Sequence, residues 1–187
     1  LNSVTDSYGF GLVGHWQNAQ TDYRLALINN TLYLLKIHDG YVSPLQSASF
    51  TVSRGVPYHL KLRINSSGEG VQLQGKIWQE QEPAAWMVEV KDMNQPLVHG
   101  RQGLWAAHAD CYFLGFLLRS VSPPASGDKG PSYAMDLAGT ALGSMPSEWQ
   151  SLKGLWMVDQ WQDRRALRQA AADSLPDFDD NAFALMV

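Results

Sequence analysis

Apolar and polar residues alternate with a period of two along several short stretches of the chain, and this period is typical of β-strands. The clearest alternation is in residues 58–64, and residues 71–78 repeat it. In the first stretch, the apolar positions are Tyr58, Leu60, Leu62 and Ile64, opposite His59, Lys61 and Arg63. In the second, Val71, Leu73 and Ile77 lie opposite Gln72, Gln74 and Lys76. A slip of one residue would expose each apolar set, so we expect both registers to be well specified, with the apolar faces in a core.

Residues 21–40 predict a hairpin. The positions of Tyr23, Leu25 and Leu27 alternate with less apolar ones, and Asn29-Asn30 follows as a two-residue turn. Asparagine tolerates the left-handed backbone that such a turn requires. The return stretch, residues 32–37, is apolar on both faces, which indicates a strand covered on both sides.

The rest of the chain contains more short strand candidates separated by Gly, Asn, Asp and Pro turns. These candidates are residues 50–53, 85–90, 103–109, 111–121 and 154–159. Many short strands of this kind predict an all-β sandwich or jelly roll. Residues 122–132 are rich in Pro, Gly and Ser and lack periodicity, so we predict a linker or a long loop. The chain then divides into a main part (1–121), a linker (122–139) and a late segment (140–187).

Four segments, taken in order, carry a resemblance to a known family. They are "GFGLVGHWQNAQTDYRLALINNTLYLLKIHDG", "VPYHLKLRI", "GKIW" and "GRQGLWAAHADCYFLGFLL". Together they resemble the second half of a concanavalin A-like jelly roll, in the laminin G-like and 3-keto-disaccharide-hydrolase-like group. The match covers roughly residues 8–119. It implies an all-β, concanavalin A-like jelly-roll sandwich of antiparallel strands.

The usual beginning of that family is missing before residue 8, and "EWQSLKGLWMVDQWQDRRALRQ" near the end resembles it. The chain therefore looks either permuted or cut from a tandem array. We expect one closed sandwich in which residues 140–187 fill the vacant strand positions. Residues 165–169 would then form a strand against their helix propensity. Trp156 and Val158 would be buried beside the early strands.

Composition narrows the function. The chain has 187 residues, 45% hydrophobic and 17% charged, which suits one globular domain or a domain plus a fragment. A net charge of −4 argues against nucleic acid as a partner. No apolar run approaches the ~18 residues that cross a bilayer, so we expect no membrane insertion. The one cysteine, Cys111, lies in an apolar run and is predicted to be a buried, inert thiol.

The sequence offers few catalytic or metal-binding patterns. Glucanases of the resembled superfamily place their carboxylates at alternate positions of one strand. Glu89 and Asp92 are three residues apart, which places them on opposite faces of a strand. We therefore predict no catalytic residues. The acidic residues Asp173, Asp177, Asp179 and Asp180 raise calcium as a cofactor, because laminin G-like domains often hold one. EF-hand spacing is absent, so we predict a solvated loop and no metal or other cofactor.

Tryptophans are the strongest binding candidates, since the chain has seven. A sugar ring packs its C–H face on an aromatic ring while amides and carboxylates bond its hydroxyls. Trp16 has polar neighbours, Trp78 lies on the outer side of its strand, and Trp86 follows a polar loop. We predict these three as binding residues, with ordinary packing as the alternative for each. Trp105, Trp149 and Trp156 are expected in the core.

These observations favour a non-catalytic carbohydrate-binding or adhesion module, similar to a lectin, of a larger extracellular or cell-envelope protein. Its predicted partners are a glycan or polysaccharide and the other modules of the parent chain. Two N-glycosylation sequons, at Asn29 and Asn65, are compatible with that location. The alternatives are a glycoside hydrolase-like domain related to 3-keto-disaccharide hydrolases and a structural spacer repeat.

Overall fold

The computed structural model describes residues 9–120, 132–170 and 181–186, and these ranges are all-β with antiparallel pairing. They contain no helix, and thus none that could cross a membrane. The strands are β1 (Gly9–Asn18), β2 (Thr21–Ile28), β3 (Thr31–His38), β4 (Tyr41–Ser49), β5 (His59–Ser67), β6 (Gly70–Trp78), β7 (Val88–Asp92), β8 (Arg101–Ala107), β9 (Cys111–Phe113), β10 (Leu117–Arg119), β11 (Ser132–Ala134), β12 (Trp149–Lys153), β13 (Leu155–Trp161), β14 (Arg164–Ala170) and β15 (Asn181–Met186).

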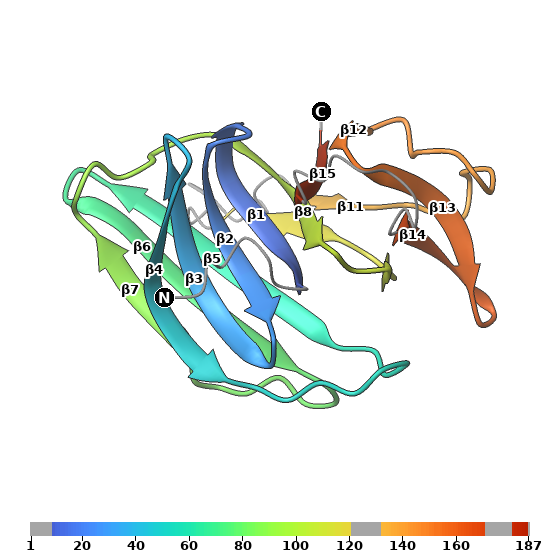
Figure 1. Ribbon diagram of the computed structural model, residues 1–187, viewed down its shortest axis with the longest axis horizontal. Helices are drawn as coiled ribbons and strands as arrows, with labels where there is room; N and C mark the ends of the chain where they lie inside the picture. The colour runs from blue at the N-terminus through green and yellow to red at the C-terminus, as the bar shows by residue number, and fades with distance from the viewer. Residues whose placement is uncertain (1–8, 121–131, 171–180, 187) are drawn as a thin grey trace, which may run out of the picture.

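The largest of the described sheets has seven strands, in the order β12-β15-β8-β1-β2-β3-β4. Two three-stranded sheets, β5-β6-β7 and β13-β14-β9, pack against it, and β10 pairs with β11 in a small separate ribbon. Figure 1 shows β1–β4 in front of β5–β7 at one end of the molecule and the β13–β14 hairpin at the other. Sheets facing each other across apolar side chains make the architecture β-sandwich-like, in agreement with the all-β prediction.

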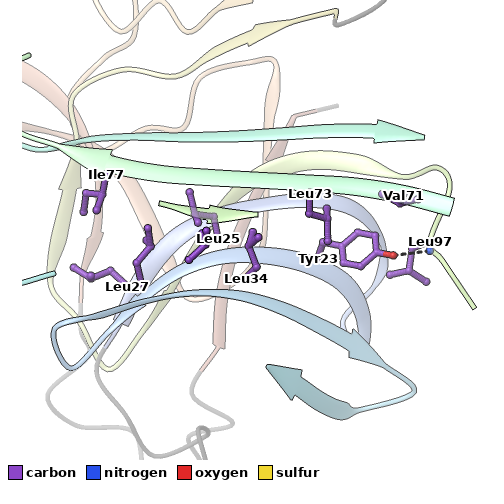
Figure 2. Close-up of a cluster of buried hydrophobic side chains, with 10 residues drawn as sticks. Tyr23, Leu25, Leu27, Leu34, Val71, Leu73, Ile77 and Leu97 are labelled. Atoms are coloured by element: carbon purple, nitrogen blue, oxygen red, sulfur yellow. Dashed lines mark hydrogen bonds between the residues drawn. The ribbon is translucent and has the colours of Figure 1, made fainter. Parts of the chain in front are cut away.

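The first core lies between β1–β4 and the sheet β5-β6-β7. Its buried side chains come mainly from the predicted hairpin and from residues 71–78. They are Tyr23, Leu25, Leu27, Leu32, Leu34, Val71, Leu73, Ile77, Val88 and Leu97. Leu60, Leu62 and Ile64 of β5 pack on the same cluster, which confirms the predicted strand face. Figure 2 shows this row of side chains, with Tyr23 at one end beside Leu97.

The second core joins the late strands to the early ones. Trp156 and Val158 of β13 are buried in one cluster with Leu104 and Ala106 of β8, as expected. Strand β15 inserts between β8 and β12, so two segments about eighty residues apart in sequence pair directly. Phe10 and Leu12 of β1 pack against both clusters.

Residues 165–169 do form part of a strand, β14, in spite of their helix propensity. Ala166, Leu167 and Gln169 are buried there, and the strand pairs with β13 on one side and β9 on the other. Tertiary pairing and burial therefore outweigh a local preference worth a few tenths of a kcal/mol per residue.

Two predicted strands differ from the structure, and part of the predicted linker contains a strand. Residues 50–53 are not a strand: pairing ends at Ser49, and Phe50 and Val52 pack on the first core from an irregular segment. Residues 111–121 are not one strand but contain β9 and β10, which belong to different sheets. Of the predicted linker, residues 132–139 are described; they include β11 and the buried Met135 and Leu137. The domain boundaries themselves stay a prediction.

Candidate functional site

Trp78 and Trp86, two of the three predicted binding residues, both lie against Lys76 on the outer side of the sheet β5-β6-β7. Trp78 ends β6, and Trp86 lies just before β7 begins. The antiparallel register of β5 and β6 sets Trp78 opposite His59 and Lys76 opposite Lys61. Because side chains two apart on a strand share a face, Lys76 and Trp78 point outward together. We name this group, with His59, Lys61 and Glu82, the Trp78–Trp86 cluster.

The aromatic rings of this cluster surround one lysine. Nζ of Lys76 lies 4.7 Å from the ring centre of Trp86 and 5.8 Å from that of Trp78. It also donates a hydrogen bond of 2.6 Å to the carbonyl of Pro83. The sequence pattern suggests a solvated Lys76, yet the residue is 4% exposed, because two tryptophans and the loop before β7 cover it. Cation–π contacts of this kind attract the ammonium group to the ring faces.

One carboxylate pairs with two ammonium groups in the cluster. Glu82 Oε1 lies 2.8 Å from Nζ of both Lys61 and Lys76. Hydrogen bonds from Lys61 and Lys76 lower the pKa of Glu82 to about 2, so the carboxylate stays ionised at neutral and mildly acidic pH. One positive charge remains uncompensated within the trio. Lys61 keeps about half of its side chain exposed and can turn toward a ligand.

His59 and the rest of the outer face extend the cluster into a polar surface. The His59 and Trp78 rings stack with centroids 5.2 Å apart and planes 17° from parallel. Farther along, Gln72 and Gln74 both donate to Oε1 of Glu89, at 3.0 and 2.9 Å. A row of amides and a carboxylate next to aromatic rings can bond hydroxyl groups that donate and accept at once.

Trp16 does not join this cluster. It packs with the residues on the opposite face of the seven-stranded sheet, and its ring centre lies 5.8 Å from the guanidinium carbon of Arg101. The structure therefore brings together two of the three predicted residues. Trp105, Trp149 and Trp156 are buried, as expected.

The carboxylates of β7 occupy opposite faces, as the spacing predicts. Glu89 is exposed on the outer side, whereas Asp92 is buried on the inner side. Within the described residues, no group of three or more His, Cys, Asp or Glu side chains is arranged to hold a metal. Asp173, Asp177, Asp179 and Asp180 lie outside the described residues.

Cys111 keeps part of its surface exposed in β9, which is less burial than the sequence pattern indicates. Burial of its thiol, together with the neighbouring charge of Asp110, nevertheless raises its pKa to about 12. A thiol that stays protonated is a poor nucleophile, in agreement with the prediction of an inert group.

Sequence reasoning missed the buried charges. Lys36, in the otherwise apolar strand β3, pairs with Asp92 at 2.8 Å, and Arg24 pairs with Asp22 in fully buried β2. The sequence did contain one sign of a buried charge. Lys36 lies in a stretch that is apolar on both faces, and a charge buried in such a strand requires a partner. The local sequence pattern could not show that the partner of Lys36 is Asp92, at the end of β7.

The chain matches no family model, and no curated protein or solved structure is similar enough to match it.

Proposed function

We propose that this protein is a non-catalytic carbohydrate-binding or adhesion module. In this proposal, its fold is a concanavalin A-like jelly roll, and it belongs to a larger extracellular or cell-envelope protein. The outer side of the sheet β5-β6-β7 binds the glycan. The main support is that Trp78 and Trp86 both lie against Lys76, beside a row of amide and charged side chains.

The chemistry of the surface suits a sugar chain. Both tryptophans are partly exposed and can offer flat apolar area to the C–H face of a pyranose, and Lys76 lies against both rings. Binding to a preorganised surface costs less free energy, because the protein side chains need not be ordered when the ligand binds. Lys61, with half its side chain exposed, supplies a donor to hydroxyl or carboxylate oxygens. The opposite-face positions of Glu89 and Asp92 argue against a hydrolase that uses this pair.

Affinity electrophoresis tests the proposal with four soluble polysaccharides: a β-glucan, a xylan, a galactomannan and an alginate. At least one should retard the native protein. Trp78→Ala and Trp86→Ala should each weaken that binding about tenfold or more, as for aromatic anchors at other interfaces.

Trp161→Ala is the matched control, because Trp161 is a partly buried tryptophan of β13 in a different sheet. It should bind as the native protein does. The proposal fails if no polysaccharide retards the native protein, or if the three variants lose binding equally while their melting temperatures stay unchanged.

A further inference from the structure

A pocket lined by both polar and apolar groups lies at the open edge of the sandwich, away from the Trp78–Trp86 cluster. There, β4 and β7 are the edge strands of the two facing sheets. The pocket has a volume of about 240 Å³. Its walls include His38 at the end of β3, Tyr41, Ser43 and the apolar Leu45 of β4, and Asn94 and Gln95 in the loop after β7.

The floor of the pocket is a buried ion pair. The side chains of Lys36 and Asp92 are 9% and 5% exposed, and their charged atoms lie 2.8 Å apart. Asp92 also accepts a 2.5 Å hydrogen bond from the Tyr23 hydroxyl and one of 3.0 Å from the Asn94 N–H. Apolar residues of similar volume often stabilise a fold as well as a buried ion pair does. A polar floor is thus not explained by stability alone.

This network holds the loop that forms one wall. Lys36 donates to the carbonyls of both Asn94 and Gln95, the second at 2.8 Å. Farther along the loop, the Leu97 N–H donates to the Tyr23 hydroxyl at 3.0 Å, as Figure 2 shows. The Leu97 carbonyl accepts from Nδ1 of His15 at 2.6 Å. The loop backbone is tied at several points, so the wall is formed before any ligand arrives.

The walls, in contrast to the floor, have hydrogen-bonding capacity to spare. In the described part of the chain, the side chains of the five polar wall residues make no hydrogen bond to another residue. Tyr41 is 80% exposed, so its ring faces water instead of the core. An exposed aromatic ring therefore borders a small pocket that contains unpaired hydroxyl, imidazole and amide groups.

We propose that this pocket binds one neutral sugar ring, with its C–H face on Tyr41. Sugar hydroxyls donate and accept, as do the serine and amide groups of the walls. Lys36 and Asp92 compensate each other, so the floor does not favour a charged ligand. Ligand pockets commonly measure about 300–1,000 Å³, and this smaller pocket limits the occupant to a single ring. The site is separate from the Trp78–Trp86 cluster and does not rest on the function proposed for it.

NMR titration of the whole chain with methyl glycosides of glucose, galactose, mannose and N-acetylglucosamine tests this site. At least one glycoside, at millimolar concentration, should shift the Tyr41 ring resonances and the Ser43 and Asn94 amides. Tyr41→Ala should weaken that binding about tenfold or more, and Asn94→Ala should weaken it too.

Met93→Ala is the control, since Met93 is 70% exposed next to the same loop and does not line the pocket. It should bind as the native protein does, and so should Trp78→Ala. Absence of shifts at Tyr41 with every glycoside would overturn the proposal, as would unchanged affinity in Tyr41→Ala. Loss of polysaccharide binding in Trp78→Ala with normal glycoside binding would separate the two sites.

Discussion

Asp92 shows how much one side chain can depend on distant partners. Burial alone would raise its pKa, but hydrogen bonds from Lys36, Tyr23 and the Asn94 N–H outweigh burial and hold the pKa below 3.8. The carboxylate therefore stabilises the fold at neutral pH. That contribution is lost as the pH falls from 3.8 through the lower pKa of the folded state, because the unfolded chain takes up the proton first.

We expect Asp92→Asn to lower the free energy of unfolding at pH 7 by about 3–5 kcal/mol, since it leaves a buried ammonium without its counter-charge. Urea denaturation measures the change. Glu89→Gln, an exposed position on the same strand, should cost less than about 0.5 kcal/mol. The difference between the two variants should shrink as the pH falls below 3.8. A similar cost at both positions would mean that the ion pair does not hold the loop.

Residue-scale features divide into those that local sequence shows and those it hides. The alternating pattern correctly predicted that Leu60, Leu62 and Ile64 face a core. This prediction requires only a comparison of residues one and two positions apart in the sequence. The partner of Lys36 comes from a strand more than fifty residues later, so no local pattern could reveal it. Trp78 and Trp86 were predicted singly, and the loop that brings them together around Lys76 became visible only in three dimensions.

At the scale of elements, β4 was missed because it is an edge strand. Its register shifts by one residue opposite Leu34 and Leu35, and it carries Pro44 and several serines. A bulge breaks the period of two on which strand prediction depends.

The strand β1 lies so close to β2 that one of its positions requires a glycine. A Cβ atom at Gly11 would lie 2.0 Å from the backbone oxygen of Leu25.

Gly11→Ala should therefore destabilise the protein by at least about 1–3 kcal/mol, the usual cost of overpacking, because a backbone atom must move to make room. Gly68→Ala is the matched control, as nothing lies within 4 Å of its added Cβ atom. Thermal melting of both variants measures the effect. Equal melting temperatures would show that β1 and β2 are not packed as closely as described.

At the scale of the whole molecule, the late strands complete surfaces that the early strands leave open. Removing residues 140–187 would uncover Leu104 and Ala106 and the pairing edge of β8. Proteins rarely tolerate new apolar patches above a few hundred Å². A chain of residues 1–120 should therefore aggregate when expressed alone and become soluble when co-expressed with residues 132–187.

Size-exclusion chromatography and a pull-down through a tag on one fragment measure whether the two fragments associate. Co-elution of the two fragments at the size of the intact protein supports a single sandwich. A monomeric 1–120 fragment with a cooperative melting transition would contradict it and favour separate units from a tandem array.

The insertion of β15 between β8 and β12 also has a consequence during synthesis on the ribosome. Residues 101–107 leave the exit tunnel well before residues 181–186, yet they are hydrogen-bonded neighbours in the finished sheet. At about 5–20 residues per second, the nascent chain exposes one half-finished sheet edge for seconds. Non-local pairing of this kind also slows folding. We expect chaperones that hold exposed strand edges to raise the yield of this protein more than a faster translation rate does.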